Sequence, residues 1–489
     1  MNAGPASQCI PNYRLFTEGR IKDIHNATLQ LLENIGVSVM LPEGIQLLKD
    51  AGCRINGDGN VQIPSGLVEA CIQSAPASIT IYNRNGAEAM RLEGNKVHFG
   101  LGTDLLKTYD LDTGRLRSSR LQDVVNAARI ADYFKDIDFI ASYAHPQDIP
   151  ANLAYVESFR AELENSIKPI FFTAAGPEDL AIIIEMAKSV AGGKDRLRQK
   201  PFIIHYSEPT SPLTHSSSAL RKLFLCAAKR VPVTYTPGML SGASGPVTLA
   251  GAITVANAEA LSGIVLHQLM AKGAPIISGF GISTMDMLTG APIYACPEYR
   301  LALSACADLY HYYEIPMWGT AGVSDANCLD QQAGMEAAMS LLMAALDGAN
   351  LIHDVGYLGQ GLIGSPAAIV MSAEIISYVK RMMRGFDIGE DRIGMDVIRQ
   401  VGPGGDFLNT AQTLKLHRQE HWRPMFANRS SLIQWQDQGQ KTYGEIATRK
   451  AIEILKSHAC ESLPEDLQQN LAAIGKKAKT MLLNKHFDV

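Results

Sequence analysis

The sequence lacks the features of a secreted or membrane-bound protein. Its first 13 residues are polar and contain no apolar core of a secretory signal. The longest apolar stretches, residues 261–280 and 339–352, are interrupted by polar or charged residues, so we expect buried helix-then-strand units. The eight cysteines form no CxxC pair, which argues against a disulfide framework and a zinc knuckle. We therefore expect a cytoplasmic protein without membrane association.

The sequence also lacks an excess of positive charge. It has 44 Lys and Arg against 49 Asp and Glu, a net charge of −5, so nucleic acid is not an expected partner. Charged residues make up 19% of the chain and apolar residues 46%, which is typical of a globular protein. A length of 489 residues is enough for more than one domain.

A regular alternation of apolar strands and amphipathic helices begins near residue 96 and repeats eight times. Short continuous apolar strands, each followed by a helix, are typical of parallel strands covered by helices. Eight such units predict a TIM (β/α)8 barrel rather than the competing doubly wound sheet. The expected strands are residues 97–101, 139–144, 169–173, 202–206, 231–235, 275–279, 316–319 and 350–354. The expected helices are residues 121–133, 153–164, 177–190, 216–228, 249–270, 298–312, 331–346 and 366–383.

This alternation divides the chain into three predicted regions. They are an N-terminal helical region with a small sheet, residues 1–95, the α/β barrel, residues 96–383, and a C-terminal helical extension, residues 384–489. The extension carries a glycine-rich turn at 402–405 and two helical patterns, 443–457 and 463–481. The last pattern is rich in lysine, which indicates a solvated helix or a contact in a homo-oligomer.

Aromatic residues gather at the expected strand ends, whereas Lys and Arg are absent there. In such a barrel the active site lies at the C-terminal ends of the strands. Aromatics are 7% of the chain but occur at or beside seven of the eight ends. Ring faces attract a quaternary ammonium, so we predict a pocket for an apolar or cationic small ligand. Because side chains alternate along a strand, about half of the rings are expected in the core. The predicted substrate-binding side chains are Tyr143, His205, Tyr206, Phe280, Trp318, His353 and Tyr357.

Three histidines at these strand ends offer the alternative of a metal site. His145, His205 and His353 follow three different strands, and three histidines can hold a catalytic zinc. However, the sequence contains no HExxH motif and no HxH pair at the first strand end. We therefore expect neutral histidines and no metal. His353 and Asp354 are adjacent on a strand, so their side chains are expected on opposite faces.

The segment from Gly359 to Gly364 matches the pattern GxGxxG. A dinucleotide site also needs an acidic residue at the end of the next strand, but a helix that begins near Pro366 follows here instead. We predict an anion site at this turn, where Gly359 and Gly361 offer backbone N–H groups to a carboxylate. A plain turn is the alternative, and Arg117, Arg300 or another distant arginine would then hold the carboxylate.

Several long motifs occur along the chain. They are residues 97–102 with 109–114, 211–213, 245–252 with 257–259, and 402–408 followed by Thr413, Leu414, Arg418 and Trp422. These segments resemble the trimethylamine methyltransferase superfamily, specifically its members that lack pyrrolysine and act on betaines. The resemblance covers most of the chain. One departure is Asp406, where the family pattern has a histidine.

The resemblance implies a TIM barrel that moves a methyl group from a methylated amine to the Co(I) form of a corrinoid on a separate protein. It implies no cofactor bound directly, a small quaternary-amine substrate and a cognate corrinoid protein as partners. The trimethylamine enzymes carry pyrrolysine in the loop after the seventh strand. Here residues 319–325 are all standard amino acids. In this respect the chain is similar to the members that act on glycine betaine, proline betaine or carnitine.

A quaternary nitrogen has no lone pair and leaves as a neutral amine, so this reaction requires no acid–base pair and depends on orientation.

Two other activities stay open on the same barrel. A zinc-dependent corrinoid methyltransferase of the methanol type would need zinc, and a non-catalytic betaine-binding barrel would form no methyl-cobalamin. The sequence does not select among glycine betaine, proline betaine, carnitine and butyrobetaine.

Overall fold

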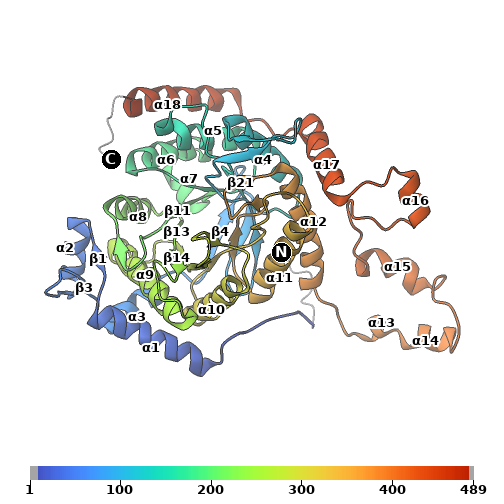
Figure 1. Cartoon of the computed structure of the whole chain (residues 1–489), viewed down its shortest axis with the longest axis horizontal. Coiled ribbons are helices and arrows are strands. Elements are labelled where there is room, and N and C mark those ends of the chain that lie inside the picture. The colour runs from blue at the N-terminus through green and yellow to red at the C-terminus, as the bar shows by residue number, and fades with distance from the viewer. Residues whose placement is uncertain (1–8, 484–489) are drawn as a thin grey trace.

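The computed structural model describes residues 9–483 and has a mixed α/β fold (Figure 1). Helices surround the strands of the body, and part of the C-terminal region extends away from it on the right of the view. One large hydrophobic cluster with members from Leu32 to Leu482 forms the core. Residues from all three predicted regions therefore share one core.

Eight short parallel strands form the centre of the body, and each overlaps a predicted strand. Five pair in the order β15-β13-β11-β10-β9 and three in the order β18-β19-β6. Isolated parallel bridges join Gly100 to Phe139 and Ser278 to Met317, at the edges of the two sheets. The predicted positions and parallel orientation are confirmed. The strands are β6 (His98–Phe99), β9 (Ile140–Ala141), β10 (Ile170–Phe172), β11 (Ile203–Ser207), β13 (Val233–Tyr235), β15 (Ile276–Ser278), β18 (Trp318–Thr320) and β19 (Leu351–His353).

Eight helices follow these strands, close to the predicted bounds. The Ser216, Asp330 and Ser365 side chains each accept a hydrogen bond from a backbone N–H of the first helical turn, which explains where α8, α11 and α12 begin. The helices are α4 (Leu121–Tyr133), α5 (Ala154–Asn165), α6 (Pro177–Ala191), α8 (Ser217–Lys229), α9 (Leu249–Met270), α10 (Pro297–Tyr313), α11 (Gln331–Asp347) and α12 (Pro366–Met383). The short elements η1 (Ala151–Leu153) and α7 (Lys194–Gln199) lie between them.

Among the described residues, α9 is the one helix that is long and apolar enough to span a membrane, by length and composition alone. An 18-residue stretch of this 22-residue helix has a mean hydropathy of 1.6, and 72% of that stretch is buried inside the protein. A helix that is apolar all round and buried by its neighbours is a core helix of a large fold.

Short strands follow several of the central strands and shape the loops at their C-terminal ends. After β6, β7 (Lys107–Tyr109) and β8 (Leu116–Ser118) form a hairpin that joins the hairpin of β20 (Tyr357–Leu358) and β21 (Ile363–Gly364). After β13 and β15, β14 (Gly238–Ser241) pairs with β16 (Gly281–Met285), which also pairs with β17 (Pro292–Ile293).

The described N-terminal residues, 9–95, are helical with small strands. Here α1 (Glu18–Asn34), α2 (Pro42–Asp50) and α3 (Ser65–Ser74) accompany the hairpins β2 (Arg54–Ile55) with β3 (Val61–Gln62) and β4 (Ile79–Tyr82) with β5 (Glu88–Leu92). Strand β1 (Ser38–Val39) pairs with β12 (Thr214–His215), so this region is joined to the body by main-chain hydrogen bonds.

The C-terminal residues divide into an arm and two packed helices. Helix α17 (Tyr443–Ser457) packs on α12, and α18 (Glu465–Leu483) packs on α6. Between α12 and α17 the chain forms α13 (Glu390–Ile393), α14 (Met395–Val401), α15 (Ala411–Glu420) and α16 (Leu432–Asp437), which extend outward in Figure 1. We call residues 384–441 the C-terminal arm.

Candidate functional site

Rings from four strands meet at the C-terminal ends of the central strands. Tyr206 of β11 stacks on Trp318 of β18 with ring centroids 5.9 Å apart. His353 of β19 lies 4.9 Å from Trp318 and 5.7 Å from Tyr206, and Phe171 of β10 lies 5.4 Å from Tyr206. We call these four residues the aromatic cluster. It unites side chains from both parallel sheets.

The rings of the aromatic cluster differ in exposure. Trp318, His353 and Phe171 are buried, whereas Tyr206 is half-buried and reaches solvent. The indole nitrogen of Trp318 and both ring nitrogens of His353 are buried and have no hydrogen-bond partner among the described residues. Buried nitrogens without partners are uncommon and often mark functional sites.

Two carboxylates lie beside the aromatic cluster. The Tyr206 hydroxyl donates to Glu208 Oε2 at 2.9 Å. The Thr173 hydroxyl donates to Asp104 Oδ2 at 3.2 Å, and His145 Nδ1 lies 3.9 Å from Asp104 Oδ1. Burial raises the pKa of both carboxyl groups above the ordinary range, and the hydrogen bonds that they accept offset part of this rise. Solvent still reaches both side chains, so they line an open recess rather than the core.

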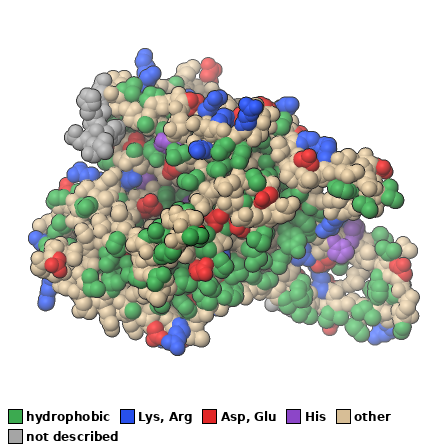
Figure 2. Space-filling model, in the orientation of Figure 1, with side chains coloured by type: hydrophobic (Ala, Val, Ile, Leu, Met, Phe, Trp, Pro, Cys, Tyr) green, Lys and Arg blue, Asp and Glu red, His purple; other side chains and the backbone are tan. Residues whose placement is uncertain are grey.

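Figure 2 shows a recess in the body, with acidic and histidine side chains visible in it. Strands β11 and β13 are labelled in the same area of Figure 1. The central strands thus end at a hollowed part of the surface.

The prediction that His353 and Asp354 point apart is wrong. His353 Nδ1 lies 2.7 Å from Asp354 Oδ1, although the contact does not have the geometry of a hydrogen bond. Asp354 has a φ of 79°, so the strand alternation ends before it and its carboxylate turns back toward the histidine. Asp354 therefore adds a third carboxylate at the edge of the aromatic cluster.

Gly102 makes room for this arrangement. A Cβ atom at this position would lie 2.2 Å from Asp354 Oδ1 and 2.4 Å from the Tyr357 hydroxyl. That hydroxyl donates to the Thr103 carbonyl at 2.6 Å, which fixes the ring in place. The Asp354 and Tyr357 side chains, which follow β19, therefore leave room only for a glycine at position 102.

The substitution Gly102→Ala is expected to displace Asp354 and Tyr357, because the added methyl group overlaps both. Overpacking of this kind costs about 1–3 kcal/mol of the free energy of unfolding. Thermal denaturation measures this loss, and ligand titration is expected to show weaker binding of quaternary amines. Gly66→Ala is the matched control, since a Cβ there meets nothing within 4 Å. An unchanged melting temperature for Gly102→Ala would contradict this description.

The structure places two predicted binding residues away from the recess. His205 is fully buried, its Nδ1 lies 3.2 Å from the Phe172 carbonyl oxygen, and its ring packs on Phe172. It occupies the face of β11 opposite to Tyr206, as strand alternation requires. Phe280 is also fully buried and packs edge-on against Tyr310 of α10. Both rings pack toward the helices.

Two further predicted residues support the loops instead. Tyr143 is fully buried, its hydroxyl donates to the Gly356 carbonyl at 2.7 Å, and it accepts a hydrogen bond from the Ser365 N–H. Tyr357 packs edge-on against Tyr143 with ring centroids 5.6 Å apart. Tyr143 joins the end of β9 to the start of α12, and Tyr357 stands between it and Asp354.

The glycine-rich turn offers fewer free donors than the sequence led us to expect. Gly359 and Gly361 belong to the tight turn that joins β20 to β21. The Gly359 N–H donates to the Ala326 carbonyl at 2.8 Å, and the Gln360 N–H donates to the Ser324 carbonyl at 3.3 Å. Main-chain carbonyls occupy these two donors, so they are not free for a carboxylate, and the anion site at this turn stays a prediction.

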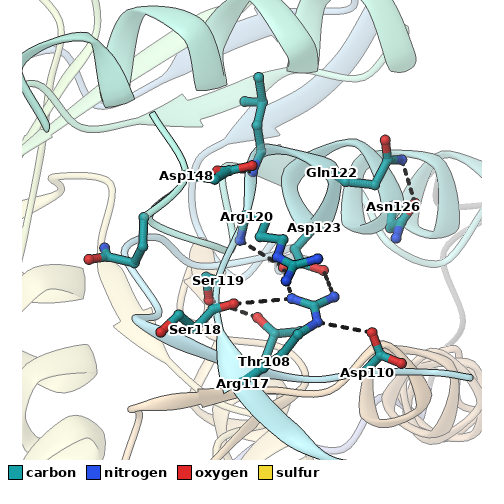
Figure 3. A network of polar contacts seen from close by, with 12 residues as sticks. Thr108, Asp110, Arg117, Ser118, Ser119, Arg120, Gln122, Asp123, Asn126 and Asp148 are labelled. Carbon is teal, nitrogen blue, oxygen red and sulfur yellow. Dashed lines mark hydrogen bonds and ion pairs between the residues drawn. The ribbon is translucent and has the colours of Figure 1, made fainter. Parts of the chain in front are cut away.

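The two arginines considered as alternatives are also occupied. Arg117 forms a bidentate ion pair with Asp123, at 2.7 and 2.9 Å, and its Nε donates to Asp110 at 2.9 Å (Figure 3). Arg300 donates to the Thr320 carbonyl at 2.7 Å and stacks on the Tyr299 ring. Arg117 therefore stabilises the β7–β8 hairpin against α4, and Arg300 supports the end of β18.

Lys222 is a cation near the recess that the sequence did not single out. Its Nζ donates to the Ala174 carbonyl, just beyond β10, at 2.9 Å. Burial lowers the pKa of Lys222, whereas the nearby carboxylates of Asp179, Glu208 and Asp104 raise it in part. This side chain is on α8, and no pattern of strand ends could have revealed it.

The three histidines of the zinc alternative are not brought together. His145 pairs with Asp104 and packs on the Tyr155 ring, His205 faces the helices, and His353 belongs to the aromatic cluster. Within residues 9–483 no group of three or more His, Cys, Asp or Glu side chains is arranged to hold a metal ion.

Comparisons with known proteins identify the family of this chain. Residues 2–481 match the family model described as trimethylamine methyltransferase (MTTB). A glycine betaine methyltransferase of Desulfitobacterium hafniense is 31% identical over 95% of this chain and 97% of its own length. A trimethylamine methyltransferase MttB of the same species is 31% identical over 94% and 92%, and one of Methanosarcina barkeri is 32% identical over 95% of each chain.

Solved structures show a similar fold. The monomethylamine methyltransferase MtmB of Methanosarcina barkeri aligns with a TM-score of 0.52 over 97% of this chain and 90% of its own, at 9% identity. A hydroxylamine complex of MtmB gives the same TM-score at 8% identity, with 97% and 88% covered. Because the family model spans nearly the whole sequence, the chain belongs to the trimethylamine methyltransferase family.

Proposed function

We propose that this protein moves a methyl group from a quaternary amine, glycine betaine or a related betaine, to the Co(I) corrinoid of a partner protein. The observation that carries the proposal is the aromatic cluster, with Tyr206 open to the recess and the carboxylates of Glu208, Asp104 and Asp354 around it. Ring faces and carboxylates both favour a cation. The family membership and the betaine-specific relative support the same reaction.

The two parallel sheets are proposed to be one (β/α)8 barrel, residues 96–383, between an N-terminal region, residues 1–95, and a C-terminal extension, residues 384–489. The support is the order of the strands. The edge strands β9 and β6 are bridged by Gly100 and Phe139, and the edge strands β15 and β18 are bridged by Ser278 and Met317. In a TIM barrel the loops at the C-terminal ends of the strands build the active site.

The proposed role of these residues is to bind and orient the substrate. Tyr206, Trp318 and His353 would hold the methylated nitrogen, with Tyr357 positioning Asp354. A tertiary amine leaves without a proton, so no side chain needs to act as an acid or base. The corrinoid cobalt supplies the nucleophile, and the protein supplies proximity and orientation. The positive charge fades as the methyl leaves, so the rings and carboxylates favour binding more than the rate of transfer.

A betaine also carries a carboxylate, for which Lys222 is the proposed partner. Lys222→Met is expected to weaken the binding of glycine betaine about 5–30-fold while that of choline, which lacks the carboxylate, changes by less than about 2-fold, since a charge-assisted contact contributes about 1–2 kcal/mol. Titration calorimetry with both ligands measures this difference. Equal losses for both ligands would assign Lys222 a role in folding instead.

The experiment that tests the function is a methyl-transfer screen with free Co(I) cobalamin and a panel of glycine betaine, proline betaine, carnitine, butyrobetaine, choline and trimethylamine. Saturable methyl-cobalamin formation from a quaternary amine is the expected result. Transfer only after zinc is added would favour the zinc-dependent alternative, and binding without transfer would favour a betaine-binding protein.

The proposal extends to the cellular setting. We propose a cytoplasmic enzyme that binds no cofactor directly, takes part in one-carbon metabolism and assembles as a homo-oligomer. The buried position of the apolar helix α9 and the eight free cysteines are consistent with that setting.

A further inference from the structure

Two of the long motifs in the sequence, residues 211–213 and 257–259, meet in the structure. Glu259 of α9 is fully buried, its Oε2 accepts a hydrogen bond from the Ser211 hydroxyl at 2.6 Å, and its Oε1 accepts one from the Leu213 N–H at 3.0 Å. No other acidic residue and no Lys or Arg occurs in α9. Burial of a carboxyl group is unfavourable unless its contacts compensate, and the proposed methyl transfer assigns no role to Glu259.

The loop that Glu259 contacts, residues 208–215, joins two parts of the candidate site. It begins with Glu208, which accepts the hydrogen bond from the Tyr206 hydroxyl at 2.9 Å. It ends just before α8, the helix that carries Lys222. Only two residues separate Glu208 from Ser211, so the position of the anchored segment limits where the Glu208 carboxylate can lie.

The last residue of the loop has an anchor of its own. His215 is fully buried, its Nδ1 lies 2.9 Å from the Tyr235 hydroxyl, and its Nε2 lies 2.9 Å from the hydroxyl of Ser262. Ser262 is three residues after Glu259 on α9, and β12 pairs with β1 of the N-terminal region. In Figure 1, β1, α8 and α9 lie on the same side of the body. The end of the loop is thus fixed by several elements, and Glu259 supplies a side-chain anchor for the part nearer to Glu208.

We propose that Glu259 is a positioning residue, which holds the loop 208–215 so that the Glu208 carboxylate faces the methylated nitrogen beside Tyr206. This inference rests on the proposed function, because it concerns the binding of the quaternary amine. Glu259 itself is buried and does not touch the substrate in this description. A binding carboxylate on an exposed loop is effective only when residues behind it fix its position.

The contacts of Glu259 do not depend on its charge. Burial raises the pKa of Glu259 to about 7, and the hydrogen bonds from Ser211 and Leu213 offset part of this rise. A hydroxyl group can donate to a carboxylate or accept from a protonated carboxyl group, so Ser211 can serve either form. The Leu213 N–H needs only the carbonyl oxygen. A glutamine at position 259 can therefore keep both contacts.

Another buried carboxylate offers a matched comparison. Glu374 of α12 is also buried, and it accepts hydrogen bonds from the N–H groups of Met425 and Ala427 at 2.9 and 3.2 Å. It anchors the C-terminal arm, which contributes no side chain to the aromatic cluster. Glu259 and Glu374 thus hold a loop in the same way, and they differ in whether that loop carries a residue of the candidate site.

The test measures the affinity of choline by titration calorimetry, since choline reports on the cation alone. Glu259→Met keeps the length of the side chain and removes both contacts, so binding is expected to be about 10-fold weaker. Glu259→Gln is expected to stay within about 3-fold of the wild type, because it can donate to Ser211 and accept from Leu213. Glu374→Met is the control and is expected to change affinity by less than about 2-fold. Circular dichroism establishes that each variant is folded.

A double variant separates positioning from a general loss of stability. Glu208→Gln removes the charge of the binding carboxylate and is expected to weaken choline about 10-fold. If Glu259 acts through Glu208, adding Glu259→Met to this variant is expected to change affinity by less than about 2-fold, because the losses of coupled residues do not add. Hydrogen exchange of the loop amides is expected to be at least ~10-fold faster in Glu259→Met and unchanged in Glu259→Gln.

Several outcomes would overturn the inference. They are a folded Glu259→Met that binds choline as tightly as the wild type, an equal loss in Glu374→Met, and losses that multiply in the double variant. If Glu259→Met does not fold, Ser211→Ala decides instead. It removes one contact of Glu259 and is expected to weaken choline about 3-fold, and unchanged binding refutes the inference. A wild type that binds no quaternary amine would contradict the proposed function itself, whereas wild-type binding with an unaffected Glu259→Met contradicts this inference alone.

Discussion

Replacement of Tyr206 by leucine is expected to weaken the binding of a quaternary amine about 30-fold. Tyr206 is the ring of the aromatic cluster that reaches the recess, and it stacks on Trp318. A desolvated cation over an aromatic face gains about 2 kcal/mol, which corresponds to this change in affinity. Calorimetric titration with glycine betaine, proline betaine and choline measures the effect.

Two matched variants separate the ring from other contributions. Tyr206→Phe keeps the aromatic face and removes only the hydrogen bond to Glu208, so we expect a change of less than about 5-fold. Phe280→Leu removes a buried ring that follows a neighbouring strand but packs on α10, so it is expected to lower stability and leave affinity unchanged. If all three variants bind equally well, the recess does not hold the cation.

The positions of the central strands could be predicted because burial on both faces produces continuous apolar segments. The Ile203–Ser207 strand and its seven counterparts have no polar alternation, and each is followed by a helix, three of which begin at a side-chain cap, Ser216, Asp330 or Ser365. The hairpin of β20 with β21 was not predicted, since strands of two residues are too short to show a period.

The candidate site could be predicted only in part. Sequence placed both His205 and Tyr206 at a strand end, but register decides which of the two faces the other rings, and one residue of shift exchanges them. Tyr206, Trp318 and His353 meet, whereas His205 and Phe280 face the helices. The excess of aromatic residues at the strand ends therefore identified the end of the sheet where the candidate site lies. It did not distinguish the residues of the site from those of the core.

The polar side of the site required the tertiary structure. Asp104 and Glu208 directly follow two predicted strands and could have been selected by the same argument as the rings. Lys222 approaches from a helix and Asp354 turns back through a left-handed backbone conformation, which no local pattern predicts for a non-glycine residue. The sequence of the glycine-rich turn suits an anion, but it does not show that the Gly359 and Gln360 N–H groups donate to the loop after β18.

The last prediction concerns Asp347, whose substitution by asparagine is expected to stabilise the protein at pH 8 but not at pH 4. Asp347 ends α11, is almost fully buried and accepts a hydrogen bond from Ser304 at 2.9 Å. Burial raises the pKa of this carboxyl group to about 7. The folded protein therefore keeps the proton up to about pH 7, whereas the unfolded chain loses it near pH 4.

Between these two values the folded state binds more protons, so the free energy of unfolding falls as pH rises. A difference of about three pH units corresponds to roughly 2–4 kcal/mol, with nearly all of it lost by pH 8. Asparagine has no proton to lose, so Asp347→Asn is expected to match the wild type at pH 4 and exceed it by that amount at pH 8. Urea denaturation at both pH values measures the difference, with the exposed Asp58→Asn as control. Glu259, whose pKa is also raised to about 7 by burial, titrates in both proteins and cancels in the comparison. A gain that is equal at the two pH values would therefore show that Asp347 is ionised in the folded state throughout this range.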